Sequence, residues 1–293
     1  MDGLTRIHGF ARRIGERLKQ EDGFTLSELL SAQIIGGFVI AAAISMVMIA
    51  FNSSARTTDR INSAQQGRIA MEEIQQRLRS QTCLYQSEYL LNGATQASGG
   101  TIAFLHASPT RMVFFSDLGN TGGSTAATGS VGFSPIIRYL TFDTGATTGT
   151  GAYRLGKFVE GAVPPSTSAI PFKFALGVSA VTGLAPVTGM NTLVPTTQRA
   201  FAEGVTNDVS GAATLPIFNY YDSLGAAVPT AADGSIAWTG LDQIDSVGVR
   251  FRILGQSGKD SATAPSGSTA SIDDRTASFN DQIYLRTSQN ACA

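Results

Sequence analysis

The chain has 293 residues and a formal net charge of −1, with basic and acidic residues nearly balanced. This length holds one large domain or two small ones, and the charge balance excludes a global basic field for nucleic acid or an acidic solvating tail. The only two cysteines, Cys83 and Cys292, lie too far apart for a CxxC redox motif or a zinc knuckle.

The composition changes sharply near residue 84. Before this point lie a basic segment and one dense apolar run, whereas the rest of the chain is rich in Gly, Thr, Ser and Ala, with short β-type runs between. We therefore expect the main boundary of the protein here.

Residues 29–51 form an apolar run without a charged side chain. As a helix with a rise of about 1.5 Å per residue, this run spans a hydrocarbon core of about 30 Å. The preceding residues 1–23 are polar and include five basic side chains, which favour a cytoplasmic N-terminus and place the bulk of the chain outside the cytoplasm.

The basic segment and the apolar run after it also have two simpler interpretations as membrane-targeting segments. A secretory signal peptide has a shorter apolar core followed by a small-residue cleavage site, whereas this run is long and continues into a polar helical pattern. A signal anchor that is never cleaved is the second alternative. The residues at the start of the run distinguish between these interpretations.

The segment from Gly23 to Leu30 reads GFTLSELL. With the basic leader before it and the apolar run after it, this segment resembles the type III signal sequence of type IV prepilins and pseudopilins. The resemblance implies cleavage after Gly23 by a prepilin peptidase, N-methylation of the new N-terminal Phe24, and an assembly role for Glu28 at the fifth mature position. It covers only about 30 residues.

A carboxylate at the edge of an apolar membrane segment is costly and usually functional. The resemblance implies that Glu28 pairs with the amine of Phe24 of a neighbouring subunit in a filament, which sets the axial register. The alternative is that Glu28 lies at the lipid headgroup boundary and reaches into water.

The helix is expected to continue beyond the membrane, so that residues 24–82 form one long N-terminal helix. Apolar side chains recur every three or four residues in its outer part, which predicts an amphipathic stripe covered by the C-terminal domain. The members of this stripe are Ile61, Ala64, Ala70, Met71, Ile74 and Leu78.

Residues 83–293 are expected to form a β-rich globular head, which makes the fold class α+β. Val247, Val249, Phe251 and Ile253 alternate with other residues in the pattern of a strand with one buried face, and residues 279–286 show the same alternation. The strand candidates are 101–105, 111–115, 136–142, 153–159, 171–176, 217–221, 247–254 and 279–286.

The order of the head segments resembles minor pilins of the PilW type and pseudopilin J. The resemblance rests on the strand with Tyr153-Arg154, the turn Phe218-Asn-Tyr-Tyr-Asp222 and the final pair of long strands. The long Gly/Thr-rich insertions and the terminal Cys292 depart from an average member of this family. They leave open whether the chain is a minor or a major subunit.

The head carries no catalytic motif such as HExxH or GxSxG, and we expect no enzyme activity, no catalytic residue and no metal site. His106 is the only histidine outside the leader. The acidic pair Asp273-Asp274 and Asp222 could hold calcium, although a solvated acidic loop is the more common outcome. Trp238, Tyr220 and Tyr221 could form a binding patch, but core packing is the favoured interpretation.

The sequence thus predicts a minor pilin or pseudopilin whose partners are the prepilin peptidase and other pilin subunits. It would be a single-pass protein of the cytoplasmic membrane before assembly into a pilus or pseudopilus. A surface-displayed binding pilin for adhesion or DNA uptake is the alternative, but eleven basic against fourteen acidic residues in the head argue against nucleic acid.

The two cysteines lie in the part expected outside the cytoplasm. There they could pair, because that environment is oxidising, or they could remain as unpaired thiols. A disulfide between Cys83 and Cys292 would stabilise the fold by roughly 3–5 kcal/mol, since it closes a very long loop in the unfolded chain.

Overall fold

The computed structural model describes residues 25–91, 101–117, 135–143, 155–167, 170–176, 197–207, 215–255 and 276–285. They form one long helix, a short helix, one 3₁₀ turn and twelve strands. In chain order these are α2 (Leu26–Arg79), β1 (Leu84–Tyr85), η1 (Gln86–Glu88), β2 (Tyr89–Leu91), β3 (Thr101–Ile102), β4 (Phe104–Ser108), β5 (Arg111–Ser116), β6 (Ile136–Asp143), β7 (Gly156–Val163), β8 (Phe172–Phe174), β9 (Thr197–Thr206), β10 (Phe218–Tyr221), α3 (Trp238–Leu241), β11 (Ser246–Leu254) and β12 (Thr276–Tyr284).

The chain divides into two compact units, Met1–Ala55 and Arg56–Ala293. The first contains the apolar part of α2. The second contains the amphipathic part of α2 together with all the strands. The protein therefore has a long apolar N-terminal helix and a β-rich body, as the α+β prediction requires.

Helix α2 is continuous because its sequence has no proline, and it ends at Arg79 rather than near Thr82 as predicted. The backbone N–H of Ser80 still bonds to the carbonyl of Gln76 (3.1 Å), but the N–H of Thr82 bonds to the carbonyl of Phe115 in β5 (3.0 Å). The last predicted turn is thus replaced by pairing with the sheet.

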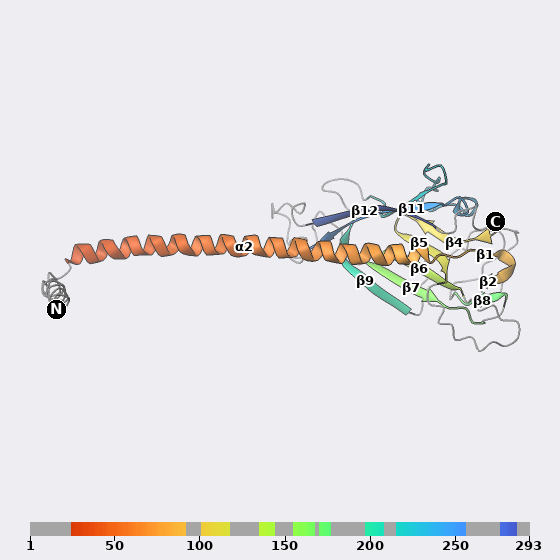
Figure 1. Ribbon diagram of the computed structural model, residues 1–293, viewed down its shortest axis with the longest axis horizontal. Helices are drawn as coiled ribbons and strands as arrows, with labels where there is room; N and C mark the ends of the chain where they lie inside the picture. Colours follow the sequence, from red (N-terminus) through yellow and green to blue (C-terminus); the bar gives the residue numbers. More distant parts are fainter. Residues whose placement is uncertain are drawn as a thin grey trace, which may run out of the picture. The chain divides into compact units, whose positions relative to one another are not determined.

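The main sheet has eight antiparallel strands in the order β10-β11-β9-β7-β6-β5-β4, with β12 on β11. One edge of β11 pairs with β12 along its whole length. The other edge is shared between β10, which pairs with Ser246–Val249, and β9, which pairs with Arg252 and Ile253. In Figure 1 the second half of α2 runs with β11 and β12 on one side and β7 and β9 on the other.

The larger core fills the space between α2 and the sheet. Ala70, Met71, Ile74 and Leu78 of the helix are buried against alternate residues of the strands, as the predicted stripe requires. The strand residues of this core include Phe114, Leu140, Phe158, Val249 and Phe251.

A second core covers the opposite face of the same sheet. In β5, Val113 and Phe115 point to this core, whereas Met112 and Phe114 point to α2, as alternation along a strand requires. Two small sheets form its cover, the antiparallel pair β1–β3 and the parallel pair β2–β8. The middle strands are therefore buried on both faces.

Each predicted strand has a counterpart, with shifted ends. The predicted buried face of β11 is confirmed, since Val247, Val249, Phe251 and Ile253 are all buried. Strand β9 was not among the strand candidates, because its sequence TQRAFAEGVT lacks apolar alternation. It nevertheless lies inside the sheet, between β7 and β11.

The predicted stripe is wrong at its first member, because Ile61 is 52% exposed. At this level of the helix the buried residues are Ser63 and Gly67. The ring of Phe279 in β12 lies directly on Gly67, so a residue without a side chain takes the place expected for an apolar one.

Candidate functional site

The N-terminal end of α2 is closed by a capping box made of Thr25 and Glu28. The Glu28 Oε2 accepts hydrogen bonds from the Thr25 backbone N–H (3.0 Å) and the Thr25 hydroxyl (2.9 Å). In return, the Thr25 Oγ1 accepts a bond from the Glu28 backbone N–H (3.3 Å). This reciprocal pattern is that of a capping box. It gives the Thr25 N–H a partner, while the Glu28 N–H also donates to the Thr25 carbonyl (3.0 Å).

The capping box gives Glu28 a role within its own chain. The carboxylate is nonetheless exposed, and it lies at the helix N-terminus, where the helix dipole favours negative charge. Gly23 and Phe24 lie outside the described residues, so the predicted cleavage site has no structural description. The geometry therefore shows Glu28 held in place and accessible.

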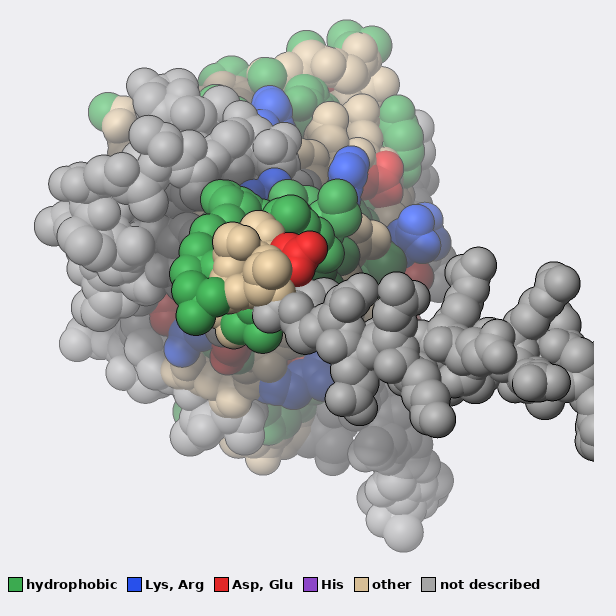
Figure 2. Space-filling model, turned by 90° about the vertical axis from the view of Figure 1, so that its left-hand side faces the viewer, with side chains coloured by type: hydrophobic (Ala, Val, Ile, Leu, Met, Phe, Trp, Pro, Cys, Tyr) green, Lys and Arg blue, Asp and Glu red, His purple; other side chains and the backbone are tan. Residues whose placement is uncertain are grey.

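Helix α2 is long and apolar enough to cross a membrane, and its most apolar window is not buried within the structure. Figure 2 views the molecule from the N-terminal end of α2 and shows hydrophobic side chains around the helix, with an acidic group at that end. Ser31 and Ser45 lie within this segment and donate their hydroxyls to their own helix, to the carbonyls of Glu28 (3.0 Å) and Ala41 (2.9 Å). Both hydroxyls are thus satisfied without water, as a hydrocarbon environment demands.

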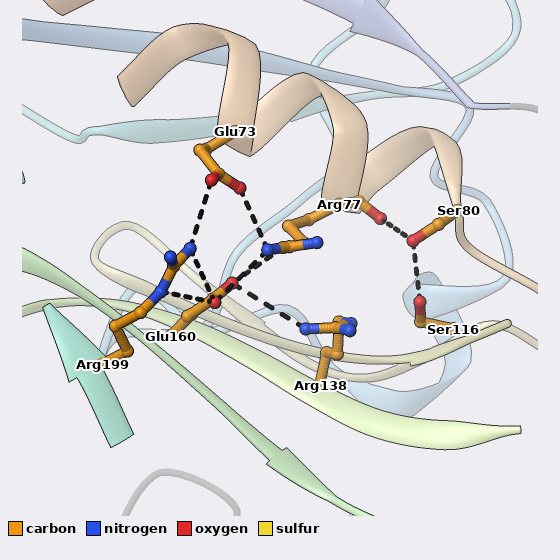
Figure 3. Close-up of polar contacts among 7 residues, drawn as sticks. All are labelled: Glu73, Arg77, Ser80, Ser116, Arg138, Glu160 and Arg199. Atoms are coloured by element: carbon orange, nitrogen blue, oxygen red, sulfur yellow. Dashed lines mark hydrogen bonds and ion pairs between the residues drawn. The ribbon is translucent and has the colours of Figure 1, made fainter. Parts of the chain in front are cut away.

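A cluster of five charged side chains joins the second half of α2 to the sheet (Figure 3). At its centre the Glu160 carboxylate of β7 accepts a bond from Arg77 Nε of α2 (2.7 Å) and one from Arg199 Nε of β9 (3.1 Å). Arg138 Nη1 of β6 lies 3.8 Å from the same carboxylate. On the helix, Glu73 pairs with Arg77 (3.0 Å) and with Arg199 (3.1 Å).

Most of this cluster is withdrawn from water, although the Arg199 side chain is 56% exposed. Burial lowers the pKa of Arg138, and the neighbouring Arg77 cation lowers it further, while the Glu160 and Glu73 carboxylates oppose this shift. For Arg199, the hydrogen bond to Glu73 and the nearby Glu160 charge raise the pKa. The cluster joins α2 to β6, β7 and β9 beside the buried stripe of the helix.

Sequence reasoning did not identify this cluster. Glu73 and Arg77 have the i, i+4 spacing of a helix ion pair, which is visible in the sequence. The contributions of Glu160, Arg138 and Arg199 come from three strands and carry no local signal. Only the pairing of β6, β7 and β9 brings them together.

The remaining predicted site residues occupy separate places. Cys83 is disulfide-bonded, but Cys292 lies outside the described residues, so their pairing stays a prediction. Tyr220 is buried, and its hydroxyl donates to the carbonyl of Ser108 (2.9 Å), which agrees with core packing. Trp238 packs against both cores.

The Asp222 carboxylate serves its own turn. Its Oδ1 accepts bonds from the backbone N–H groups of Leu224 (2.9 Å) and Ala226 (2.8 Å). Asp273 and Asp274, the other residues of the calcium hypothesis, lie outside the described residues. Within the described part of the chain, no three His, Cys, Asp or Glu side chains gather in a metal-binding arrangement.

Comparison with known proteins adds no relative to these observations. No family model, no curated protein and no solved structure matches the chain.

Proposed function

We propose that this protein is an assembly subunit of the type IV pilin-like class, made with a leader that a prepilin peptidase removes. The observation that carries the proposal is the order of features at the start of α2. A basic leader is followed by Gly23-Phe24, then Glu28, and then an uncharged run long enough to cross a membrane.

Two structural observations support the proposal. Glu28 lies exposed at the helix N-terminus, where a partner carrying a positive charge can reach its carboxylate. The same helix continues without a break into the second unit, where its buried stripe and charged cluster tie it to the sheet.

In this proposal, residues 1–23 keep the N-terminus in the cytoplasm until cleavage, and residues 29–51 hold the processed subunit in the membrane. During assembly, the apolar surface of α2 would leave the lipid and pack against the apolar helices of neighbouring subunits. Glu28 would set the axial position of each subunit relative to its neighbour by pairing with a positive charge, because an unpaired carboxylate in an apolar environment is costly.

The test is processing at Gly23. The full chain is expressed with a prepilin peptidase, and its intact mass is measured together with that of the Gly23→Val variant. We expect the wild-type chain to lose residues 1–23 and to gain one methyl group at Phe24, and the variant to keep its full mass. A wild-type chain with an unprocessed N-terminus, or one cut after the apolar run, would refute the proposal.

A further inference from the structure

The main sheet has three outer strands, β4, β10 and β12, and among the described residues only β12 has an open edge. The outer edge of β4 is covered, because the Ala107 carbonyl accepts a hydrogen bond from the Ile236 N–H (2.8 Å). The outer edge of β10 is covered in the same way, because the Tyr220 carbonyl accepts one from the Val228 N–H (2.9 Å). Strand β12 pairs with β11 on one side and with no described strand on the other.

The hydrogen-bond pattern identifies the backbone groups of β12 that face outward. The Leu285 N–H donates to the Asp245 carbonyl (3.0 Å), so the odd-numbered positions of β12 bond to β11, because bonded positions alternate along an antiparallel pair. The even-numbered positions turn their N–H and C=O groups away from the sheet over about 27 Å. Among the described residues, only the Gln282 N–H of this row has a partner, the Asp281 carboxylate beside it (2.9 Å). The outward positions are Thr276, Ser278, Asn280, Gln282 and Tyr284.

Edge strands usually carry a feature that prevents pairing with other chains, such as a lysine, a proline or a bulge. Strand β12 has the sequence TASFNDQIY, without lysine or proline, and its register with β11 shows no shift. Its one charged residue, Asp281, points to the helix side and accepts a hydrogen bond from Gln75 of α2. The exposed side chains on the other side are all uncharged, namely Ser278, Asn280, Gln282 and Tyr284. An extended chain can therefore pair with this edge.

Two arginines of α2 flank the open edge. Gln75 contacts Asp281 of β12, and Arg68 and Arg79 lie within about 40° of Gln75 around the helix, since an α-helix turns by about 100° per residue. Both arginines are exposed, and neither guanidinium makes an ion pair or hydrogen bond within the part of the chain that the structure describes. Counting the exposed Glu72 beside them, this flank of the helix keeps a net positive charge.

We propose that the open edge of β12 binds an extended acidic segment of another polypeptide chain. The segment adds one strand to the sheet through backbone hydrogen bonds to Ser278 and Asn280. A carboxylate on its helix-facing side pairs with Arg68 or Arg79. In strand addition of this kind the backbone bonds supply affinity and the side chains at alternate positions supply specificity. A carboxylate suits the flank because guanidinium groups donate charge-assisted, paired hydrogen bonds to it.

A second copy of this chain is the competing occupant, and its charge disfavours it. Among its described strands only β12 has an open edge, so the two copies would pair β12 to β12. Antiparallel pairing about a two-fold axis places α2 of both copies on one face of the joined sheet. The flanks with Arg68 and Arg79 would then face each other across the junction, and like charges in this position are costly. An acidic partner removes this repulsion.

This inference goes beyond the proposed function and does not depend on it. The edge and its flank lie within the second compact unit, so binding needs neither cleavage at Gly23 nor assembly. Failure of the binding test would leave the assembly proposal intact, and failure of processing would leave the binding edge intact.

The test uses the full chain in detergent and three peptides that match the nine residues of β12 in length and differ in one side chain. Their sequences are TSVTEVTST, TSVTQVTST and TSVTKVTST, with blocked termini. In isothermal titration we expect the Glu peptide to bind about tenfold more tightly than the Gln peptide, and the Lys peptide to bind more weakly still. Hydrogen exchange should show that the bound Glu peptide protects the amides of Ser278 and Asn280.

Matched variants locate the binding. Asn280→Pro removes an outward N–H but no hydrogen bond to β11, so this variant should fold and lose peptide binding. Asn280→Ala keeps the N–H and should bind normally. If Asn280→Pro unfolds, a Glu peptide methylated at every backbone nitrogen gives the same test, because it cannot donate to the edge and should not bind.

A second set of variants tests the charge. Arg68→Gln combined with Arg79→Gln should lower the affinity for the Glu peptide to that for the Gln peptide. Lys173→Gln, which removes an exposed cation from β8, should leave both affinities unchanged. Thermal unfolding of each variant shows whether it is folded.

The proposal is overturned if the Glu peptide does not bind, or if the Lys peptide binds as tightly. It is also overturned if a folded Asn280→Pro variant binds the Glu peptide normally, which would place the peptide elsewhere. Analytical ultracentrifugation tests the competing occupant. A wild-type dimer that Asn280→Pro dissociates would assign the edge to a second copy and would likewise overturn the proposal.

Discussion

The ring of Phe279 lies on the backbone of Gly67, so closely that a Cβ atom at position 67 would stand 1.8 Å from the Phe279 Cε2. Phe279 also stacks on Phe251, with 5.3 Å between ring centroids. The Phe279 ring thus packs the edge strand β12 against α2 at a place that only a glycine admits.

Replacing Gly67 with Ala should therefore destabilise the body, although Ala is the better helix former by about 1 kcal/mol. Overpacking of a filled core costs about 1–3 kcal/mol, so the net effect should be a lower free energy of unfolding. Gly37→Ala is the matched control, because a Cβ there meets no atom within 4 Å. Chemical denaturation of the full chain in detergent measures both.

A double variant tests whether the Phe279 ring causes the destabilisation of Gly67→Ala. If the ring is responsible, Gly67→Ala combined with Phe279→Leu should be less destabilised than the sum of the two single variants. Strict additivity would contradict the packing explanation.

Glu160 is the common partner of Arg77, Arg138 and Arg199, so its neutralisation leaves Glu73 as the one carboxylate of the cluster for three cations. Removing one partner of a buried ion pair costs about 3–5 kcal/mol, and we expect Glu160→Gln to lower the free energy of unfolding by an amount near the lower end of this range. Lys157→Gln should cost less than about 1 kcal/mol, since its pair with Asp143 spans 3.8 Å and is half-exposed. Equal losses in the two variants would show that the cluster stabilises no more than a surface pair.

His106 should make stability depend on pH. Burial lowers the pKa of His106 from 6.5 to about 4, the nearby Arg111 acts in the same direction, and Asp233 opposes it. Between these two values the unfolded chain binds a proton that the folded chain does not, so stability falls as the pH drops from about 6.5 to about 4. Below about 4 this group causes no further change.

The measurement is the free energy of unfolding of the full chain between pH 7 and pH 4, compared with that of His106→Gln. The variant should lose less stability over this interval. NMR titration of the imidazole gives the pKa directly, and a value near 6.5 would contradict the prediction.

Glu28 has two separable properties, its charge and its place in the capping box. Glu28→Gln removes the charge but keeps a side chain that can complete the box, whereas Glu28→Ala removes both. If the charge directs assembly, both variants should be processed normally and both should fail to enter filaments. Glu72→Ala, an exposed carboxylate of the same helix, is the control and should assemble.

The measurement is the amount of processed subunit in purified filaments. Normal incorporation of Glu28→Gln with loss of Glu28→Ala would assign Glu28 to capping alone. Normal incorporation of both would remove Glu28 from the assembly mechanism.

Several elements of this protein could be predicted because their signal is local. The uncharged run 29–51 indicates a helix that is apolar on all sides, and the alternation in 247–253 indicates a strand with one buried face; both signals lie within a short stretch of sequence. The polar side of the same alternation carries Arg250 and Arg252, but the sequence does not reveal that Ser278 and Asn280 lie beside them.

The sequence by itself determined the apolar segment and the β-rich character of the rest. The tertiary structure decided the inner position of β9, the contact of Gly67 with Phe279, and the cluster around Glu160. The physical reason is that each of these depends on partners far apart in the chain. The place of a glycine or of an ordinary polar strand in the fold depends on the residues that pack against it, and these lie far away in the sequence.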